Sequence, residues 1–195
     1  MQLSELVKHD EWPSGMTLWF TGLSASGKTT LCQAVADYLR AEGFPIAVLD
    51  GDEVRKTICA GLGYSPQDRE ENIRRIIMAA EGLIESGVVT LVAAISPYAA
   101  MRAQARKKLG RFVEIYVNAS LATCIERDPK DLYRRALMGE IPYFTGISDP
   151  YEPPLAPDVE CNTESETIDQ CVAKILDAAF ARGLHPPPWG TAHVA

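Results

Sequence analysis

Short apolar runs alternate with longer segments of helical periodicity along most of the chain. The runs over residues 16–21, 46–49, 88–93 and 112–117 predict buried strands. Between and after these runs, helical patterns cover residues 28 to about 42, 68–85, 121–126 and 168–180. Strands that are apolar throughout and alternate with helices are typical of a parallel sheet covered on both faces, so the pattern predicts an α/β fold.

One segment interrupts this alternation. Residues 130–157 begin with a helical pattern and then contain repeated glycine and proline. A segment of this kind inside a compact domain usually covers or binds a ligand. We therefore expect a single domain over residues 1–195, with a core over about 16–182, a lid over about 130–157 and an extended C-terminal tail over 183–195.

Charge and composition narrow the possible partners. The 195 residues include 19 Lys and Arg against 26 Asp and Glu, a net charge of −7. Such a chain repels nucleic acid and anionic membranes, so an anionic partner must be small and must meet a local basic cluster. Neither a membrane span nor a signal peptide is evident, and we expect a cytoplasmic protein. The five scattered cysteines and three histidines predict no disulfide framework or zinc site; we expect the cysteines to be reduced and mostly buried.

A phosphate-binding loop stands between the first predicted strand and helix. Residues 22–29, GLSASGKT, fit the pattern G-x-x-x-x-G-K-[ST] in the context that it requires. The loop amides and the helix N-terminus would hold the phosphates, Lys28 would reach the β- and γ-phosphates, and the Thr29 hydroxyl would bind Mg²⁺. The residues expected to bind ATP here are Gly22, Leu23, Ser24, Ala25, Ser26, Gly27, Lys28, Thr29 and Thr30.

The loop indicates nucleotide binding without fixing the reaction. No N-K-x-D segment for guanine recognition is present, and the chain is short for a large ATPase. A small-molecule kinase fits better, and its chemistry needs an acceptor held in line with the γ-phosphate, positive charge with Mg²⁺, and a lid that excludes water.

Carboxylates follow the second predicted strand. Asp50 and Asp52 lie at its carboxyl end, where open α/β sheets bind ligands. A carboxylate there would hold Mg²⁺ or orient and deprotonate an acceptor hydroxyl, while the structural alternative is that Asp52 caps the following helix. Beside the phosphate loop, we favour the functional interpretation.

Several donors and aromatic residues are candidates for the acceptor site. Arg69, Asn72, Arg74 and Arg75 would bind an anion, although an exposed helix face with i,i+4 pairs gives the same pattern. Ser96 follows a strand end, but no base flanks it, so hydrogen bonding is favoured over nucleophilic attack. For most basic residues between 102 and 111 we expect a solvated helix face.

Two aromatic residues lie in predicted loops. Tyr64 and Phe144 would sandwich a purine, or fill a minor core beneath the loop.

Together these segments closely resemble the adenylylsulfate kinase family over about residues 19–160. The resemblance is carried by residues 22–29, 49–52 with Arg55, 61–65, 68–69 with 71–75, 95–98, 126–128 with Lys130, and 144–151. It implies a nucleoside-monophosphate-kinase-like P-loop fold, usually a homodimer. It also implies transfer of phosphate from MgATP to the ribose 3′-hydroxyl of adenosine 5′-phosphosulfate, giving 3′-phosphoadenylyl sulfate for sulfate assimilation, with possible coupling to ATP sulfurylase.

The resemblance also implies residue roles. Asp52 would orient or activate the 3′-hydroxyl, with Asp50 supporting the metal region, so Thr29 and Asp52 are the expected Mg²⁺ ligands and Asp52, Lys28 and Ser96 the expected catalytic residues. The remaining expected ligands are Arg127 for ATP, and Arg55, Tyr64, Arg69, Asn72, Ile95, Ser96, Lys130 and Phe144 for the acceptor. The family's phosphoserine at the Ser96 position is not required by direct in-line transfer.

Four features depart from the family pattern. Tyr64 stands where the family generally has phenylalanine. Ala25 and Asp131 stand where glycine is common, and only Arg102 matches an arginine of the segment after Tyr98. Ala25 should be tolerated unless its φ is positive. The alternatives to the main hypothesis are another small-molecule P-loop kinase and a non-catalytic regulatory domain that binds the nucleotide, for which an eroded phosphate loop would be expected.

Overall fold

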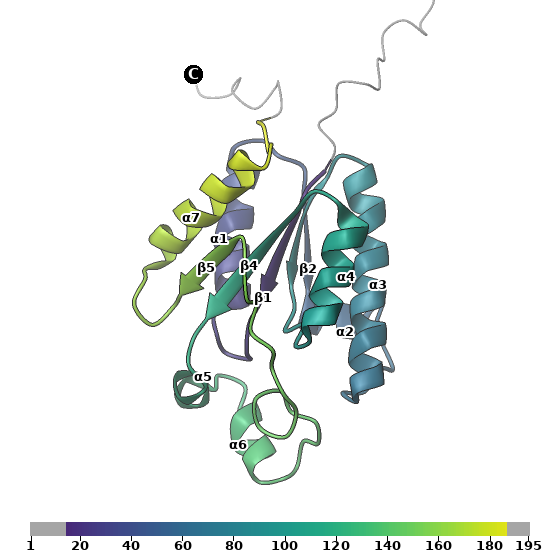
Figure 1. Ribbon diagram of the computed structural model, residues 1–195, viewed down its shortest axis with the longest axis vertical. Coiled ribbons are helices and arrows are strands. Elements are labelled where there is room, and N and C mark those ends of the chain that lie inside the picture. Colours follow the sequence, from purple (N-terminus) through teal and green to yellow (C-terminus); the bar gives the residue numbers. More distant parts are fainter. Residues whose placement is uncertain (1–14, 187–195) are drawn as a thin grey trace, which may run out of the picture.

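The structure is a computed structural model and describes residues 15–186. Its centre is a five-stranded parallel sheet in the order β2-β3-β1-β4-β5 (Figure 1). The strands are β1 (Thr17–Thr21), β2 (Ile46–Asp50), β3 (Val89–Ala93), β4 (Phe112–Asn118) and β5 (Val159–Asn162). The predicted parallel sheet is confirmed, with β5 as an additional strand.

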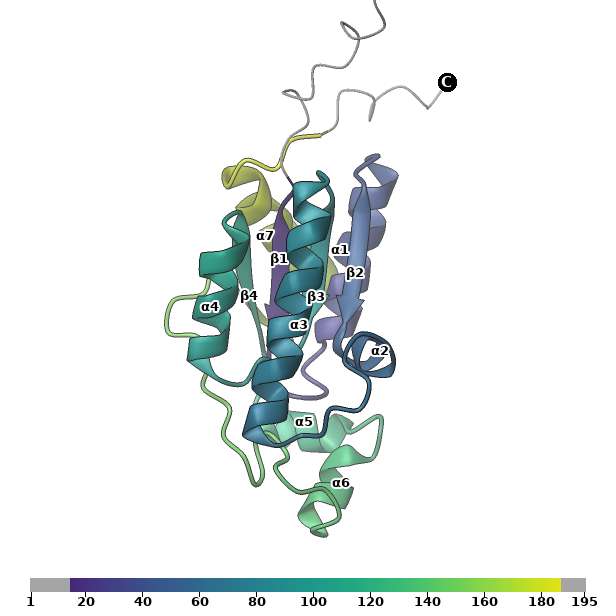
Figure 2. The same ribbon diagram turned by 90° about the vertical axis from the view of Figure 1, so that its right-hand side faces the viewer.

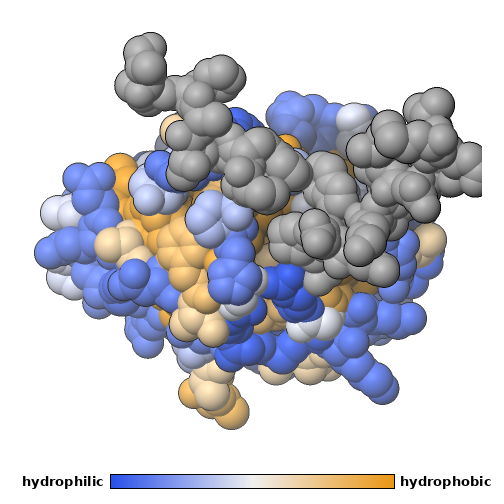
Figure 3. All heavy atoms as spheres, turned by 90° about the horizontal axis from the view of Figure 1, so that it is seen from above, coloured by the Kyte–Doolittle hydropathy of each residue, from blue (hydrophilic) through white to orange (hydrophobic). Residues whose placement is uncertain are grey.

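Helices cover both faces of the sheet, as Figures 1 and 2 show. On one face lie α1 (Lys28–Ala41) and α7 (Ile168–Ala181), and on the other α3 (Pro66–Glu85) and α4 (Ala99–Leu109). Three short helices, α2 (Gly51–Lys56), α5 (Leu121–Arg127) and α6 (Leu132–Leu137), lie toward the carboxyl ends of the strands. Figure 3 looks onto the opposite end, where apolar side chains lie among hydrophilic ones.

The two faces of the sheet form two separate apolar clusters. In β1, Leu18 and Phe20 pack on the side of α1 and α7, whereas Trp19 packs on the side of α3 and α4. All three side chains are fully buried. Because β1 is covered on both faces, its polar and apolar residues do not alternate. This burial explains the continuous apolar run in the sequence.

Most element boundaries follow local signals. The predicted helix over 68–85 begins earlier, at Pro66, because the Ser65 side chain accepts a hydrogen bond from the Asp68 amide and proline suits the first turn. Strand β5 has only four residues, of which Val159 and Cys161 are buried. So short an apolar pattern did not predict a strand. Leu184 is buried beyond the end of α7, so the core extends past residue 182. Residues 187–195 of the expected tail lie outside the described part.

The basic residues of α4 differ in exposure, although a solvated helix face was expected for most of them. Lys107 and Lys108 are exposed as predicted, but Arg102 is 3% exposed. Its Nε donates to Glu114 at 2.9 Å, and another of its nitrogens donates to the Ser96 carbonyl at 2.8 Å. One buried carboxylate and backbone carbonyls therefore hold this arginine, and Glu114, which lies on β4, is outside its local window of sequence.

Within residues 15–186, no helix combines the length and the apolar character needed to cross a membrane.

Candidate active site

The turn between β1 and α1 has the backbone of a phosphate-binding loop. Gly22 and Gly27 adopt positive φ, 152° and 103°, and a Cβ on Gly22 would lie 2.4 Å from the Val117 carbonyl oxygen. Only glycine fits such a position. Ala25 also has positive φ, 60°. The condition under which alanine was expected to be tolerated is therefore not met, and the loop carries local strain at this residue.

Lys28 lies at the first position of α1 and folds back onto the loop. Its Nζ donates to the Leu23 carbonyl at 2.6 Å. Burial lowers the pKa of Lys28 to about 8, against the opposing effect of the nearby Asp50 and Asp52 carboxylates. Lys28 therefore loses its proton at a lower pH than an ordinary lysine does. A bound polyanion would favour the protonated form.

Thr29 and Asp50 form the candidate metal site. The Thr29 hydroxyl donates to Asp50 Oδ2 at 2.8 Å, and the other carboxylate oxygen accepts from the Asp52 amide at 2.9 Å. Asp50, rather than Asp52, is therefore the cap of α2. A hydroxyl and a carboxylate in contact are the hard oxygen donors that Mg²⁺ prefers, so these residues fit the ion. The expected ligand Asp52 does not share this contact.

The Asp52 side chain faces a different partner. It forms an ion pair with Lys130 Nζ, from the segment between α5 and α6. Both side chains remain more than half exposed. The pair therefore joins the end of β2 to the predicted lid across an open cleft.

This cleft has a volume of about 1230 Å³ and follows the carboxyl ends of the strands. It exceeds the roughly 300–1,000 Å³ of ordinary small-molecule pockets, so two nucleotides can be accommodated. The predicted residues that line it are Ser24, Ala25, Gly27, Lys28, Thr29, Thr30, Asp50, Asp52, Arg55, Tyr64, Arg69, Asn72, Ile95, Ser96, Arg127, Lys130 and Phe144. Gly22, Leu23 and Ser26 of the predicted set do not line it, and Gly22 and Ser26 are buried.

One wall of the cleft combines arginine with an aromatic ring. The Arg55 guanidinium lies 4.4 Å from the Tyr64 ring centroid, and Arg69 Nε donates to the Tyr64 carbonyl at 3.0 Å. Arg69 is buried and lies 3.7 Å from Asp149. The buried Asn72 Oδ1 has no hydrogen-bond partner among the described residues, which leaves it available to a ligand.

Arg74 and Arg75 are not part of this wall. Each donates to Glu71 on the same helix, at 2.6 and 2.7 Å. The helix-face alternative therefore describes these two residues, and the anion-binding alternative is wrong for them.

Ser96 lies at the wall of the cleft but is almost fully buried. It is 2% exposed and has a φ of 41°. Its hydroxyl accepts from Trp19 Nε1 at 3.1 Å and donates to Thr21 Oγ1 at 3.0 Å. No basic side chain contacts this hydroxyl in the described part of the chain, so the geometry favours a positioning role.

The two aromatic candidates differ in environment. The Tyr64 side chain is 51% exposed, whereas Phe144 is 8% exposed. The Phe144 ring makes an edge contact with Tyr133, at 5.0 Å between centroids, inside a third apolar cluster that also contains Cys124 of α5. Phe144 therefore fills a minor core and also lines the cleft.

Arg127 binds a loop that local sequence did not single out. Its guanidinium donates to Thr163 Oγ1 at 3.0 Å and to the Thr163 carbonyl at 2.8 Å. The Thr163 hydroxyl donates in turn to the Ser26 carbonyl of the phosphate loop at 2.9 Å. Thr163 follows β5, so its place beside the loop depends on sheet order, and no sequence signal marked it.

The segment after α5 folds over this end of the sheet (Figure 2). The Tyr133 hydroxyl of α6 donates to the Ser24 carbonyl at 3.0 Å, and Tyr98 donates to Asp149 at 2.9 Å. Asp131, the residue before α6, has a φ of 59°. It is thus a second residue with positive φ at a position where the family often has glycine.

Sequence comparison finds adenylyl-sulfate kinases that are similar to this chain over most of its length. The family model for adenylylsulphate kinase matches residues 14–162. The chain is 55% identical to the adenylyl-sulfate kinase of Gloeothece citriformis over 83% of its own length and 92% of the relative's. It is 53% identical to that of a Synechococcus strain, with 87% and 97% coverage.

Solved structures give the same picture. The Mycobacterium tuberculosis APS kinase in complex with AMPPNP and APS is similar with a TM-score of 0.82 and 42% identity, covering 85% of this chain and 98% of that one. The structure named APE1195 has a TM-score of 0.80 and 42% identity, with 86% and 96% coverage. A gluconokinase from Sinorhizobium meliloti, 16% identical with a TM-score of 0.55, shares the fold.

Proposed function

The chain belongs to the adenylylsulphate kinase family, and on this premise we propose that it transfers the γ-phosphoryl group of ATP to the 3′-hydroxyl of adenosine 5′-phosphosulfate. The products are ADP and 3′-phosphoadenylyl sulfate. The observation that carries the proposal is the convergence of Lys28, Asp52 and Lys130 on one cleft large enough for two nucleotides.

On the donor side, the backbone amides of residues 22–27 and Lys28 would hold the phosphates of ATP. Thr29 and Asp50 would hold Mg²⁺, which supplies charge neutralisation at the transferring phosphate. The contact between these two side chains supports this assignment. Arg127, fixed by Thr163, would lie beside the bound nucleotide.

On the acceptor side, Asp52 would accept a hydrogen bond from the 3′-hydroxyl and orient it toward the γ-phosphate. Its carboxylate is exposed to the cleft, whereas the Asp50 carboxylate contacts Thr29 and caps α2. With the hydroxyl held there, direct in-line transfer would need no protein nucleophile.

The rest of the acceptor would lie against the wall formed by Arg55, Arg69 and Asn72. Their fixed donors suit a phosphosulfate group and a ribose. The adenine would lie between Tyr64 and Phe144, beside the backbone of Ile95. Ser96 would act indirectly, by holding the end of β3 against Trp19.

The segment over 130–157 would act as the lid of this cleft. Closure would exclude water and bring Lys130 from Asp52 to the phosphates between the two nucleotides. The exposure of the Lys130–Asp52 pair supports such an exchange, because a solvent-exposed ion pair costs little to break.

The experiment that tests the proposal is ADP release in the presence of MgATP and one acceptor at a time. We expect turnover with adenosine 5′-phosphosulfate and none with AMP or gluconate. Activity with gluconate alone would favour another small-molecule kinase, and nucleotide binding without any turnover would favour the regulatory domain.

Self-association is also part of the proposal. A solved relative is described as a hexameric APS kinase from Thiobacillus denitrificans. It is 30% identical with a TM-score of 0.67, and the match covers 88% of this chain but 30% of that one. We infer an oligomer, with the homodimer as the expected form, and light scattering on the purified chain tests it. Functional coupling to ATP sulfurylase and a cytoplasmic location stay predictions.

A further inference from the structure

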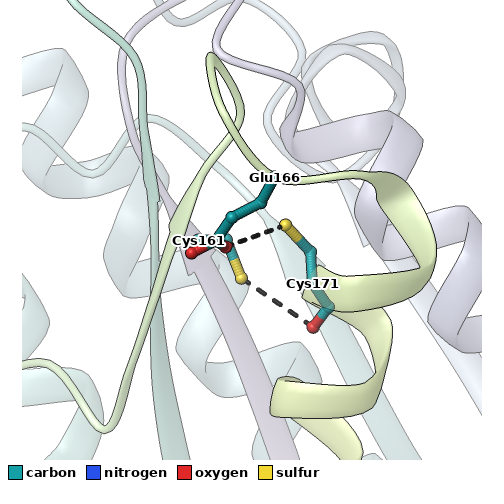
Figure 4. A group of neighbouring side chains, drawn as sticks. All are labelled: Cys161, Glu166 and Cys171. Atoms are coloured by element: carbon teal, nitrogen blue, oxygen red, sulfur yellow. Dashed lines mark hydrogen bonds between the residues drawn. The ribbon is translucent and has the colours of Figure 1, made fainter.

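Two buried cysteines and a glutamate come together outside the catalytic residues. Cys161 lies on β5, Glu166 on the loop that follows, and Cys171 on the first turns of α7 (Figure 4). The two sulfur atoms and a carboxylate oxygen all lie within 4.8 Å of one another. Among residues 15–186, this is the one such group of three found.

The contacts within the cluster hold its donors in place. The Cys171 thiol donates to Glu166 Oε2 at 3.4 Å, and the Cys161 thiol donates to the Cys171 carbonyl at 3.9 Å. Both sulfur atoms are almost inaccessible to solvent, whereas the Glu166 side chain is 27% exposed. The cluster thus has two buried sulfur ligands, and the partly exposed Glu166 carboxylate lies between them and solvent.

A cation already lies at this opening. Lys174 Nζ is 2.9 and 3.0 Å from the two carboxylate oxygens of Glu166, and it also donates to the Glu160 carbonyl. The ammonium group offsets the charge of the Glu166 carboxylate. Its side chain is 43% exposed, so it can move into solvent and leave the carboxylate to another cation.

We propose that Cys161, Glu166 and Cys171 form a binding site for Zn²⁺ or a similar thiophilic divalent ion. Two thiolates, one carboxylate and a water molecule complete the four ligands that Zn²⁺ takes. The water would enter from the cleft, which Glu166 and Cys171 line. Sulfur ligands select against Mg²⁺, so this site and the Thr29–Asp50 site would take different ions.

Binding is balanced by proton release. Both thiols donate hydrogen bonds in the free protein and are therefore neutral there, so the ion expels two protons as it binds. The two thiolates and the Glu166 carboxylate carry three negative charges against the two positive charges of the ion, which leaves one negative charge for the nearby Lys174 ammonium. No oxidant or reductant takes part.

Occupancy would act on the nucleotide cleft through the loop after β5. This loop also carries Thr163, which contacts Arg127 and the Ser26 carbonyl. An ion bound to Cys161 and Cys171 would link β5 to α7 and so fix both ends of this loop. We therefore expect Zn²⁺ to raise the thermal unfolding midpoint of the protein without nucleotide.

The test is metal binding to the full chain, reduced with a non-chelating phosphine and kept in excess Mg²⁺. Cd²⁺ serves as the spectroscopic probe because thiolate ligands give it an ultraviolet charge-transfer band. We expect one ion per chain, with affinity reduced at least about 100-fold in Cys161→Ser and in Cys171→Ser. Glu166→Gln should weaken binding while it keeps the charge-transfer band.

The matched control is Cys59→Ser, since Cys59 is buried against α3 and lies outside the cluster. It should bind the ion as the unmodified chain does. The proposal is overturned if the unmodified chain binds no ion, or if binding persists in both cluster variants. Circular dichroism of each variant without metal ensures that a loss of binding does not reflect unfolding.

Discussion

Lys130, in the segment that follows α5, forms an ion pair with Asp52 at the start of α2, although 78 positions separate them. Both side chains are more than half exposed, so the pair contributes less than about 1 kcal/mol to stability. Its significance is its location, because it joins the acceptor edge of the cleft to the proposed lid.

Substitution of Lys130 should separate function from stability. In Lys130→Ala, turnover should fall by about 100-fold because positive charge near the transferring phosphate is lost, while the urea midpoint should hardly change. Lys56→Ala is the matched control, since Lys56 forms a similarly exposed pair with Glu53 on the same short helix. Equal activity in the two variants would contradict the proposed role.

Asp52 should be required for turnover but not for folding. Asp52→Asn keeps the shape of the side chain and removes the charge that orients the acceptor hydroxyl, so we expect a loss of about 100-fold or more in ADP release. Glu53→Gln, next to it and exposed, should remain near the unmodified rate. A near-normal rate in Asp52→Asn would remove it from the catalytic residues.

Nucleotide affinity should fall as the pH rises above about 8. Burial lowers the pKa of Lys28 to about 8 in the free protein, so the ammonium form that binds phosphate is lost above this pH. Bound phosphates favour the charged form, and binding should therefore take up a proton near pH 8. Calorimetry in buffers of different ionisation enthalpy measures this uptake.

Lys28→Arg provides the control for this pH effect. A guanidinium stays charged over the whole range, so its affinity should be independent of pH even if it is weaker. A parallel decline in both proteins would assign the effect to another group.

Ser96→Ala should reduce stability more than it alters the chemistry. The change leaves the buried Trp19 Nε1 without its acceptor, which costs about 1–3 kcal/mol in urea unfolding. Ser86→Ala is the control, because that hydroxyl is exposed. Phosphoryl transfer should persist in Ser96→Ala, and ATP labelled at the γ-phosphate should leave no label on the denatured unmodified protein. A labelled Ser96 would contradict direct transfer.

Ala25→Gly should leave stability unchanged or raise it by up to about 1 kcal/mol. Glycine removes the strain at a φ of 60°, offset by its greater freedom in the unfolded chain. Ala103→Gly, on the exposed face of α4, should instead lose about 1 kcal/mol. Urea unfolding of both variants makes the comparison, and an equal loss in both would show that position 25 is unstrained.

Much of the candidate site follows from local sequence. The phosphate loop, Asp52, Arg69 and Phe144 were all predicted, and each lies at the carboxyl end of the sheet, as parallel topology requires. The roles of Asp50 and Asp52 were less certain, because capping and ligand binding use the same side chains. The two roles are told apart by which carboxylate accepts the hydrogen bond from the Asp52 amide. That contact is a property of the folded turn.

The amino-acid order by itself determined the alternating strands and helices, the glycine positions of the loop and the residues available to bind phosphate. These depend on periodicity and backbone sterics within a few residues. Tertiary structure alone decided which distant groups meet. Arg102 is buried because Glu114 lies on the neighbouring strand, Thr163 reaches the phosphate loop because β5 pairs with β4, and Cys161 meets Cys171 because α7 packs against the sheet. Such contacts arise from chain crossovers that no local window of sequence contains.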